Sequence, residues 1–139
     1  MITVEEALEG ITPLANKVRA RGPYQSPEQV VGAMRCVLPS LTEDEKIATL
    51  NAHPRIGEDP ERLSVRSLSE QGADRLPELA ELNAEYEQRF GFRFVVFVNR
   101  RPKTEILEVL RQRLTRSRAE EMDAGLEAIV DIAEDRLRS

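Results

Sequence analysis

The sequence predicts an all-α fold: one domain, residues 1–139, formed by a bundle of about six to eight helices with one extended segment near 92–98. Capping boxes, in which Ser or Thr precedes Glu or Gln by three residues, occur five times along the chain. Aliphatic residues recur at helical spacing behind most of these boxes. A chain of 139 residues, 40% of them hydrophobic, suits one compact domain and is too short for two.

Three helices are predicted before residue 54. The first begins at Thr3, and the second begins at Ser26 with Pro27 in the first helical position. The third begins at Thr42 and ends before Pro54, because the residue before a proline resists the α conformation. The apolar stripes of these helices are Ala7, Leu8, Ile11, Leu14, Ala15 and Val18; Val30, Ala33, Met34, Val37 and Leu38; and Ile47 and Leu50.

In the second half of the chain the sequence pattern predicts a loop followed by further helices. Residues 55–66 contain glycine, proline and many charges, which is typical of a loop, and Ser67 begins the fifth capping box. A later helix ends at Gly91, a natural C-terminal cap. A turn at 100–103 precedes the next helix, and the last helix begins at Ser117. The apolar stripes are Leu79, Leu82, Tyr86 and Phe90; Ile106, Leu110 and Leu114; and Met122, Leu126, Ile129, Ala133 and Leu137.

One β-prone segment, residues 92–98, interrupts the helical pattern. Five of the six aromatic residues lie between Tyr86 and Phe97. One strand cannot form a sheet alone, so the segment is either buried in extended form or paired with a strand across a dimer. Its backbone N–H and C=O groups need partners in either case, and a polar ligand is one such partner.

The residue counts exclude several kinds of site. One Cys (Cys36) and one His (His53) allow neither an intramolecular disulfide nor a Cys/His zinc site. The chain has no EF-hand spacing, no glycine-rich phosphate loop, and lysines only in polar settings, so we predict no metal and no cofactor. A net charge of −5 argues against general binding of nucleic acid.

The sequence also indicates where the protein resides. The acidic N-terminus lacks the apolar region of a signal peptide, and the longest aliphatic or aromatic run, Phe94–Val98, is far too short to span a membrane. We therefore expect a soluble protein in a reducing compartment, the cytoplasm, with no membrane contact.

His53 lies in the sequence Asn-Ala-His-Pro-Arg-Ile-Gly, at the predicted end of a helix. The negative end of the helix dipole favours a protonated imidazole there, which suits a group that holds and delivers a proton. The alternative is that His53 only caps the helix carbonyls.

The segment Ser67–Gln71 also permits two interpretations. Ser67 and Glu70 match a capping box, a device that this chain uses repeatedly. Alternatively, the helix N-terminus presents free N–H groups to an anionic or carbonyl-rich ligand, with Glu70 and Gln71 aimed at the same place. Both interpretations can hold together.

Arginines near the C-terminus have two different settings. Arg136 follows the apolar Ala133 by three residues, so a partly buried guanidinium is expected there, and it needs a carboxylate partner from the protein or a substrate. The other arginines belong to a basic stretch without interleaved aromatic residues, which favours a solvated helix face that attracts a small anion. This stretch contains Arg100, Arg101, Lys103, Arg111, Arg113, Arg116 and Arg118.

Four motifs in a fixed order resemble one family. They are Ala-His-Pro-Arg-Ile-Gly at 52–57, Ser-x-x-Glu-Gln at 67–71, Arg-Phe-Gly-Phe-x-Phe-Val at 89–95 and Ile-x-x-x-Arg-Leu at 132–137. Together they resemble 2-oxo-4-hydroxy-4-carboxy-5-ureidoimidazoline (OHCU) decarboxylase, an enzyme of urate breakdown. The resemblance implies an all-helical, cofactor-free carboxy-lyase that is commonly a homodimer and forms (S)-allantoin.

The resemblance also implies roles for individual residues. His53, Glu70 and Arg136 correspond to catalytic residues, and no metal ligand is implied. The corresponding substrate contacts are Pro54, Ser67, Leu68, Ser69, Gln71, Phe94, Val95, Val96, Phe97 and Val98. In the resembled reaction the carboxyl-bearing carbon adjoins a C=N bond, which accepts the electrons that CO2 leaves behind. The protein then has to fix the substrate and control proton transfer.

Several positions depart from the family pattern. The region before Arg21 is shorter than usual, which leaves one wall of the expected pocket undefined. Arg93 replaces Pro or Lys, Arg116 replaces Asn, and Arg100 stands where Gly is frequent. None of these departures touches the core motif residues.

Two alternative functions stay open: a helical interaction module that binds an acidic partner through its basic stretch, and a related decarboxylase or lyase with another substrate.

Overall fold

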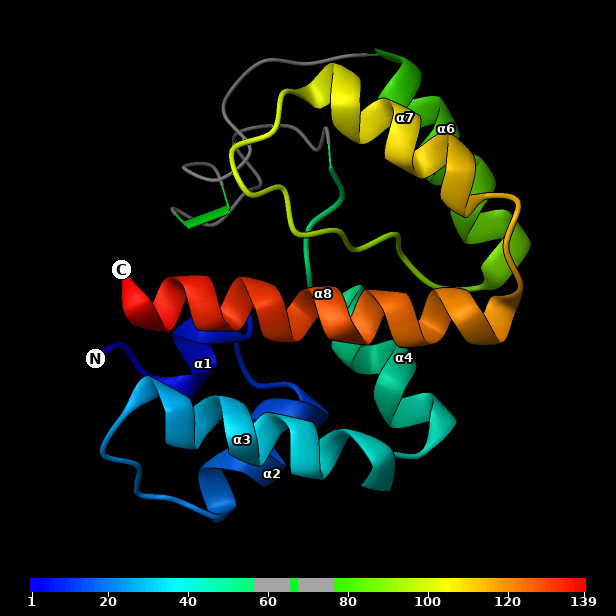
Figure 1. Cartoon of the computed structure of the whole chain (residues 1–139). Helices are drawn as coiled ribbons and strands as arrows, with labels where there is room; N and C mark the ends of the chain where they lie inside the picture. Colours follow the sequence, from blue (N-terminus) through cyan, green and yellow to red (C-terminus); the bar gives the residue numbers. More distant parts are fainter. Residues whose placement is uncertain (57–65, 68–76) are drawn as a thin grey trace.

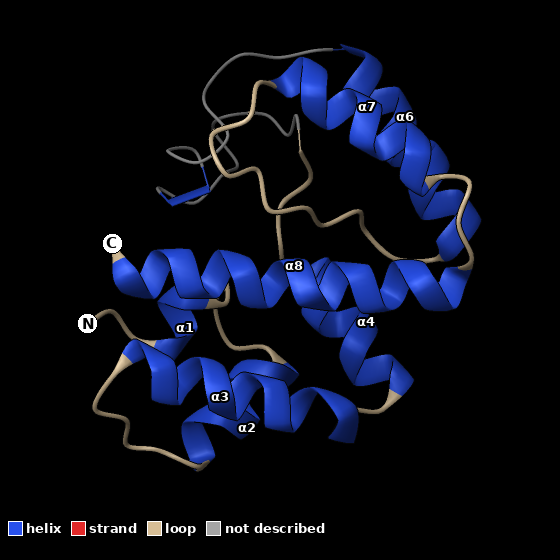
Figure 2. Ribbon diagram, in the orientation of Figure 1, coloured by secondary structure: helices blue, strands red, loops and turns tan. Residues whose placement is uncertain are grey.

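The computed structural model describes residues 1–56, 66–67 and 77–139. Within these ranges the chain forms seven α-helices and one 3-10 turn, with no strand, so the predicted all-α class is confirmed (Figures 1 and 2). The elements are α1 (Val4–Ala7), α2 (Pro13–Ala20), α3 (Pro27–Val37), η1 (Leu38–Ser40), α4 (Glu43–Asn51), α6 (Pro77–Phe90), α7 (Lys103–Arg113) and α8 (Arg118–Arg138). No helix in the described ranges has the length and hydropathy needed to span a bilayer.

Helix α8 is the central element of the molecule (Figure 1). Helices α1, α3 and α4 contact it directly, while α2 packs against α3 and α4. Helices α6 and α7 contact each other on the opposite side of α8, and the segment 92–98 passes between them and α8 (Figure 1). Because α8 has neighbours on more than one side, apolar residues occur around much of its circumference.

Four predicted helix starts are confirmed. The side-chain oxygens of Thr3, Ser26, Thr42 and Ser117 each accept a hydrogen bond from the backbone N–H three residues ahead. Ser67 differs, because Arg66 and Ser67 are themselves helical. Ser67 therefore lies inside a helical turn and not at the N-cap position that a capping box requires.

The predicted first helix is wrong, because two helices occupy this part of the chain. Glu9 and Gly10 adopt left-handed conformations, with φ of 60° and 108°, which ends α1. Thr12 then caps α2, with Pro13 in its first turn. As a result Ile11, expected on the apolar stripe, is 77% exposed.

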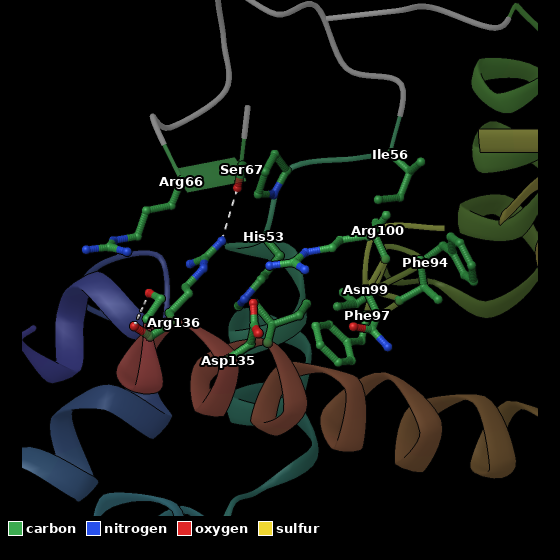
Figure 3. Close-up of a pocket in the computed structure, with 16 residues that line it drawn as sticks. His53, Ile56, Arg66, Ser67, Phe94, Phe97, Asn99, Arg100, Asp135 and Arg136 are labelled. Atoms are coloured by element: carbon green, nitrogen blue, oxygen red, sulfur yellow. Dashed lines mark hydrogen bonds between the residues drawn. The ribbon is translucent and has the colours of Figure 1, made fainter. Parts of the chain in front are cut away.

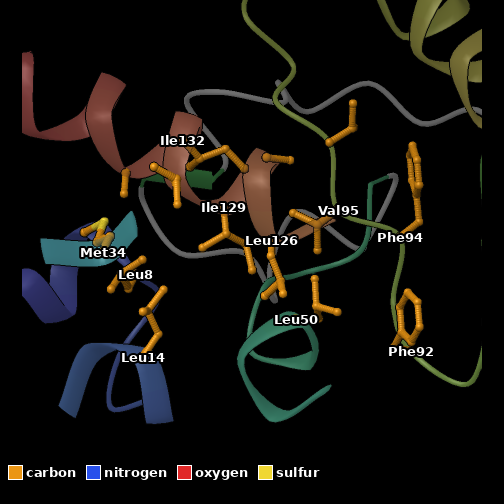
Figure 4. Packing of buried hydrophobic residues seen from close by; sticks show 14 of the residues in the cluster. Leu8, Leu14, Met34, Leu50, Phe92, Phe94, Val95, Leu126, Ile129 and Ile132 are labelled. Atoms are coloured by element: carbon orange, nitrogen blue, oxygen red, sulfur yellow. The ribbon is translucent and has the colours of Figure 1, made fainter. Parts of the chain in front are cut away.

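The core lies on both sides of α8 (Figure 4). Leu8, Leu14 and Met34 pack beneath one end of the helix, and each is fully buried. Phe92 and Phe94 lie on the other side, where they join Tyr86 and Phe90 in an aromatic cluster with ring centroids 4.6–6.2 Å apart. Such contacts anchor the segment 92–98 in the interior.

Arginine side chains bind three carbonyl groups of the segment 92–98, which is buried and extended as predicted. Arg113 Nη1 donates to Val95 O at 2.9 Å, and the Arg101 guanidinium donates to Phe97 O at 2.5 Å and Val98 O at 3.1 Å. Irregular backbone is stable in the interior only when its polar groups are paired in this way. Pairing across a dimer stays a prediction.

The predicted solvated face of the basic stretch is wrong for Arg113. This residue is only 8% exposed, and its Nε donates to Glu121 Oε1 at 2.7 Å. Glu121 is fully buried and also accepts a hydrogen bond from the Tyr86 hydroxyl at 2.7 Å. The Arg113 guanidinium also lies over the Phe94 ring, 4.6 Å from its centroid. Sequence spacing shows which residues share a helix face. It does not show that Glu121, a carboxylate of α8, packs over the face of α7 that carries Arg113.

Candidate active site

A cavity of about 490 Å³ opens where four parts of the chain meet (Figure 3). The end of α4, Ser67, the segment 94–98 and the C-terminal part of α8 all contribute to its wall. The fold thus brings together predicted site residues that are distant in sequence. Those that line the cavity are His53, Pro54, Ser67, Phe94, Val95, Val96, Phe97, Val98 and Arg136. The predicted residues Leu68, Ser69, Glu70 and Gln71 lie outside the described residues.

His53 follows α4 by two residues and is 3% exposed. Its backbone is held at both ends: its N–H donates to Leu50 O at 3.2 Å, and Arg93 Nη1 donates to its carbonyl at 3.1 Å. Neither ring nitrogen has a hydrogen-bond partner among the described residues. A buried polar group without a protein partner is uncommon and marks a place where a ligand can bind.

The pKa of His53 corrects one prediction. Burial first, and then the Arg136 guanidinium, lower this pKa, while the Glu9 carboxylate and the Thr49 backbone raise it, and the net effect is a shift from 6.5 to about 4. The imidazole is therefore neutral near pH 7, whereas the helix dipole alone predicts that protonation is favoured. Desolvation dominates because His53 is enclosed by tertiary packing, which the local sequence does not reveal.

Arg136 is 3% exposed and has a carboxylate partner, as its position predicts. Its Nη2 donates to Glu9 Oε1 at 2.8 Å and to Ser67 Oγ at 3.3 Å. Its Nη1 also reaches the carbonyl oxygens of Glu6 and Ala7, at 3.3 and 3.4 Å. These bonds fix the guanidinium at the cavity wall and compensate its charge.

Glu9 is a site residue that the sequence interpretation missed. Its Oε1 accepts hydrogen bonds from both Ser67 Oγ, at 2.5 Å, and Arg136 Nη2, at 2.8 Å. Its backbone is left-handed, with φ of 60°, which is uncommon for a residue with a side chain. The following Gly10 was the available signal, because a Glu-Gly pair favours a chain reversal over a continuous helix. The N-terminal region thus does not line the cavity itself, but its Glu9 positions two residues that do, Ser67 and Arg136.

The segment 94–98 forms a wall with available donors. Its Val95, Phe97 and Val98 carbonyls are bound by arginines, but its backbone N–H groups have no partner among the described residues. These N–H groups can therefore donate to a ligand.

Polar residues at the opening were also missed by the sequence interpretation. Asn99 and Arg100 follow the extended segment, Asp135 belongs to α8, and all three are exposed and line the cavity. Asn99 and Arg100 reach the cavity because of the turn after residue 98, and Asp135 reaches it because that face of α8 is turned toward the cavity. A sequence motif reveals neither feature. No group of three or more His, Cys, Asp or Glu residues suited to a metal ion occurs among the residues that the structure describes.

The chain is similar to known proteins over nearly its whole length. The family model described as OHCU decarboxylase matches residues 2–138. The 2-oxo-4-hydroxy-4-carboxy-5-ureidoimidazoline decarboxylase of Haloferax volcanii is 29% identical over 132 residues, which cover 89% of this chain and 78% of that protein. The uric acid degradation bifunctional protein of Bacillus sp. (strain TB-90) is 27% identical over 132 residues, covering 90% of this chain and 26% of the longer relative.

The fold is also similar to that of a solved structure. A crystal structure of OHCU decarboxylase in the presence of (S)-allantoin superposes with a TM-score of 0.72 at 25% identity. The match covers 89% of this chain and 87% of the other.

Proposed function

Since the chain belongs to the OHCU decarboxylase family, we propose that it converts 2-oxo-4-hydroxy-4-carboxy-5-ureidoimidazoline to (S)-allantoin and CO2 without a cofactor, as a step of urate degradation. The reaction breaks a carbon–carbon bond, so the protein is a carboxy-lyase. The observation that carries this proposal is the buried imidazole of His53, whose two nitrogens lack partners among the described residues, at a cavity that Arg136 also lines.

We assign His53 the proton transfers. Because its pKa is held near 4, the imidazole is neutral at pH 7 and accepts the proton of the substrate hydroxyl. The bond to the carboxylate breaks and CO2 leaves; the released electron pair forms a C=C bond to the ring carbon that carries the ureido group, and the C=N pair moves onto the ring nitrogen. The oxyanion becomes a carbonyl in the next step, when the C=C electrons take up a proton. Protonated His53 is a strong acid in this environment and delivers its proton to the ring carbon that carries the ureido group. Protonation on one face gives one enantiomer, and one further proton from water neutralises the charge that the carboxylate leaves behind.

Other residues hold the substrate in this scheme. Arg136, fixed by Glu9, faces the oxygen or nitrogen on which negative charge develops. The free N–H groups of the segment 94–98 bind the ring and ureido carbonyls. Ser67 and Gln71 complete the binding site, and Glu70 shares the hydroxyl proton with His53.

The alternative of an interaction module that uses the basic stretch has less support. Arg113 is buried, Arg111 is paired with Glu78 at 2.7 Å, and Arg118 is paired with Glu43. Few of these cations remain available for an acidic partner.

The proposal includes a cytoplasmic location and a homodimer, which rest on the family resemblance. Sedimentation equilibrium of the purified chain at micromolar concentration tests the assembly. A mass of twice 15.7 kDa supports the dimer, and a mass of 15.7 kDa contradicts it.

The activity is tested with substrate made in the cuvette from urate, uricase and hydroxyisourate hydrolase. Circular dichroism follows the appearance of (S)-allantoin, which must form faster with the protein than without it. We expect His53→Asn and Arg136→Gln to lose at least about 100-fold in kcat, a typical effect of removing a proton-transfer or charge-stabilising group.

Arg138→Gln is a matched control for Arg136→Gln. Arg138 belongs to the same helix, but its side chain is 47% exposed and pairs with Glu28 at the surface. It should keep full activity. No acceleration by folded wild-type protein would remove the proposed function, and a fully active His53→Asn variant would remove its mechanism.

A further inference from the structure

We propose that Arg100 is the residue that captures the carboxylate of the substrate at the opening of the cavity, and that it acts on binding and not on the chemical step. This inference rests on the proposed function, because it requires an anionic substrate. Arg100 is exposed and lines the cavity, and Figure 3 shows its guanidinium projecting into the cavity from the side of the extended segment.

Hydrogen bonds from Arg101 hold the backbone at Arg100 in a left-handed conformation. Asn99 and Arg100 are both left-handed, with φ of 49° and 62°. The next residue closes the turn: Arg101 N–H donates to Val98 O at 3.0 Å, and its guanidinium binds the carbonyls of Phe97 and Val98. An uncommon conformation held by three bonds from the neighbouring residue gives the Arg100 side chain a fixed origin at the opening.

The charges around the cavity distinguish Arg100 from the other cations. Arg136 binds Glu9 at 2.8 Å, and Arg66 lies 3.7 Å from a carboxylate oxygen of Glu6. Arg100 has no ion-pair partner among the residues that the structure describes. Asp135, on α8, also lines the cavity. An incoming carboxylate is repelled by this residue and attracted to Arg100, which orients the substrate as it enters.

The chemistry of the reaction limits what a cation in this position can do. Decarboxylation turns the carboxylate into neutral CO2, so a cation beside the carboxylate binds the ground state at least as strongly as the transition state. Such an interaction lowers KM without raising kcat. Because Arg100 is exposed, its attraction for an anion is also screened by salt.

Steady-state kinetics of Arg100→Gln and Arg100→Lys test the inference. We expect Arg100→Gln to raise KM about two- to fivefold, the effect of one exposed ion pair, with kcat unchanged. Its kcat/KM should depend less on salt than that of the wild type, and Arg100→Lys should restore both KM and the salt dependence. Arg111→Gln is the matched control, because Arg111 is an exposed arginine of α7, 47% accessible, that does not line the cavity.

Binding of stable compounds gives a readout without catalysis. Allantoate carries a carboxylate and ureido groups, whereas (S)-allantoin is neutral. Calorimetry should show that Arg100→Gln weakens allantoate binding by about the factor seen in KM and leaves (S)-allantoin binding unchanged. Equal KM and equal salt dependence in wild type and Arg100→Gln would overturn the inference while leaving the decarboxylase intact. A wild-type protein that binds allantoate through Arg100 but does not accelerate decarboxylation would instead overturn the proposed function.

Discussion

Replacing Glu121 by Gln tests whether the buried ion pair behind the cavity supports the extended segment. Glu121 is fully buried, and its Oε1 accepts hydrogen bonds from Tyr86 and Arg113 at 2.7 Å each. Arg113 in turn donates to Val95 O at 2.9 Å. Gln keeps the shape of the side chain and can still accept one of these hydrogen bonds, but it removes the charge that compensates Arg113.

The structure sets the size of the expected effect. The side chain of Arg113 is 10% exposed and that of Glu121 is 0% exposed, so removing one charge leaves the other almost without solvent. Breaking a buried pair in this way costs about 3–5 kcal/mol of unfolding free energy. For a chain of this length that corresponds to a fall in Tm of roughly 10–15 °C. A total stability of about 5–15 kcal/mol allows the variant to remain folded at low temperature.

Urea unfolding monitored by circular dichroism measures the change. Glu127→Gln is the matched control, because Glu127 also belongs to α8 and pairs with Arg35 at the same 2.7 Å, but with 52% and 47% of the two side chains exposed. We expect the control to lose less than about 1 kcal/mol. A difference of less than about 1 kcal/mol between the two variants would refute the reasoning that burial makes this pair important. Because Arg113 also holds Val95, kcat/KM of Glu121→Gln should fall even at temperatures where the variant is folded.

Three further predictions follow from the contacts at the site and in the helices. The pKa of His53 is lowered from 6.5 to about 4 in the folded chain. Between these pH values the histidine is protonated in the unfolded chain and neutral in the folded chain, so acid favours unfolding. His53 should therefore lower the unfolding free energy by about 3 kcal/mol as the pH falls from 6.5 to 4, and should have no such effect above pH 6.5. Urea unfolding at a series of pH values measures this loss, which His53→Asn should not show. Glu9→Gln removes the counter-charge of Arg136 and a group that raises the pKa of His53. We expect kcat/KM to fall at least about tenfold, and the acidic side of the plot of kcat/KM against pH to move to lower pH. An unchanged pH profile would contradict this. In the helices, Gly32→Ala should add about 1 kcal/mol to the unfolding free energy, because a Cβ there meets no atom within 4 Å, whereas Gly125→Ala should not stabilise, because its Cβ would lie 2.7 Å from a buried leucine side chain.

Helix boundaries were largely predictable because the bonds that define them are local. The Thr42 and Ser117 side chains each bond to a backbone N–H three residues ahead, so both partners lie within one short stretch of sequence. The same reasoning failed between Thr3 and Val18, where apolar spacing continues across a break. The left-handed conformations of Glu9 and Gly10 end the helix there. Hydrophobic periodicity could not reveal this break, because it depends on side-chain type and not on backbone conformation.

The site was predictable only in part. Motif order placed His53 and Arg136 among the candidate residues, and the structure brings both to one cavity. The ionisation of His53 was predicted wrongly, because the helix dipole is a local feature while desolvation depends on everything packed around the ring. Arg113 was assigned to a solvated face for a similar reason, since its partner comes from the next helix.

By itself the sequence determined the all-α class, four of the helix starts, the extended segment near 92–98 and the exclusion of an intramolecular disulfide and a Cys/His zinc site. These follow from composition and from interactions between residues a few positions apart. The tertiary structure decided which charges meet: Glu9 and Arg136 are 127 residues apart and lie 2.8 Å from each other. It also decided that His53 is neutral and that Arg100 faces the cavity opening. Burial and long-range pairing are properties of the packed chain, so no local pattern specifies them.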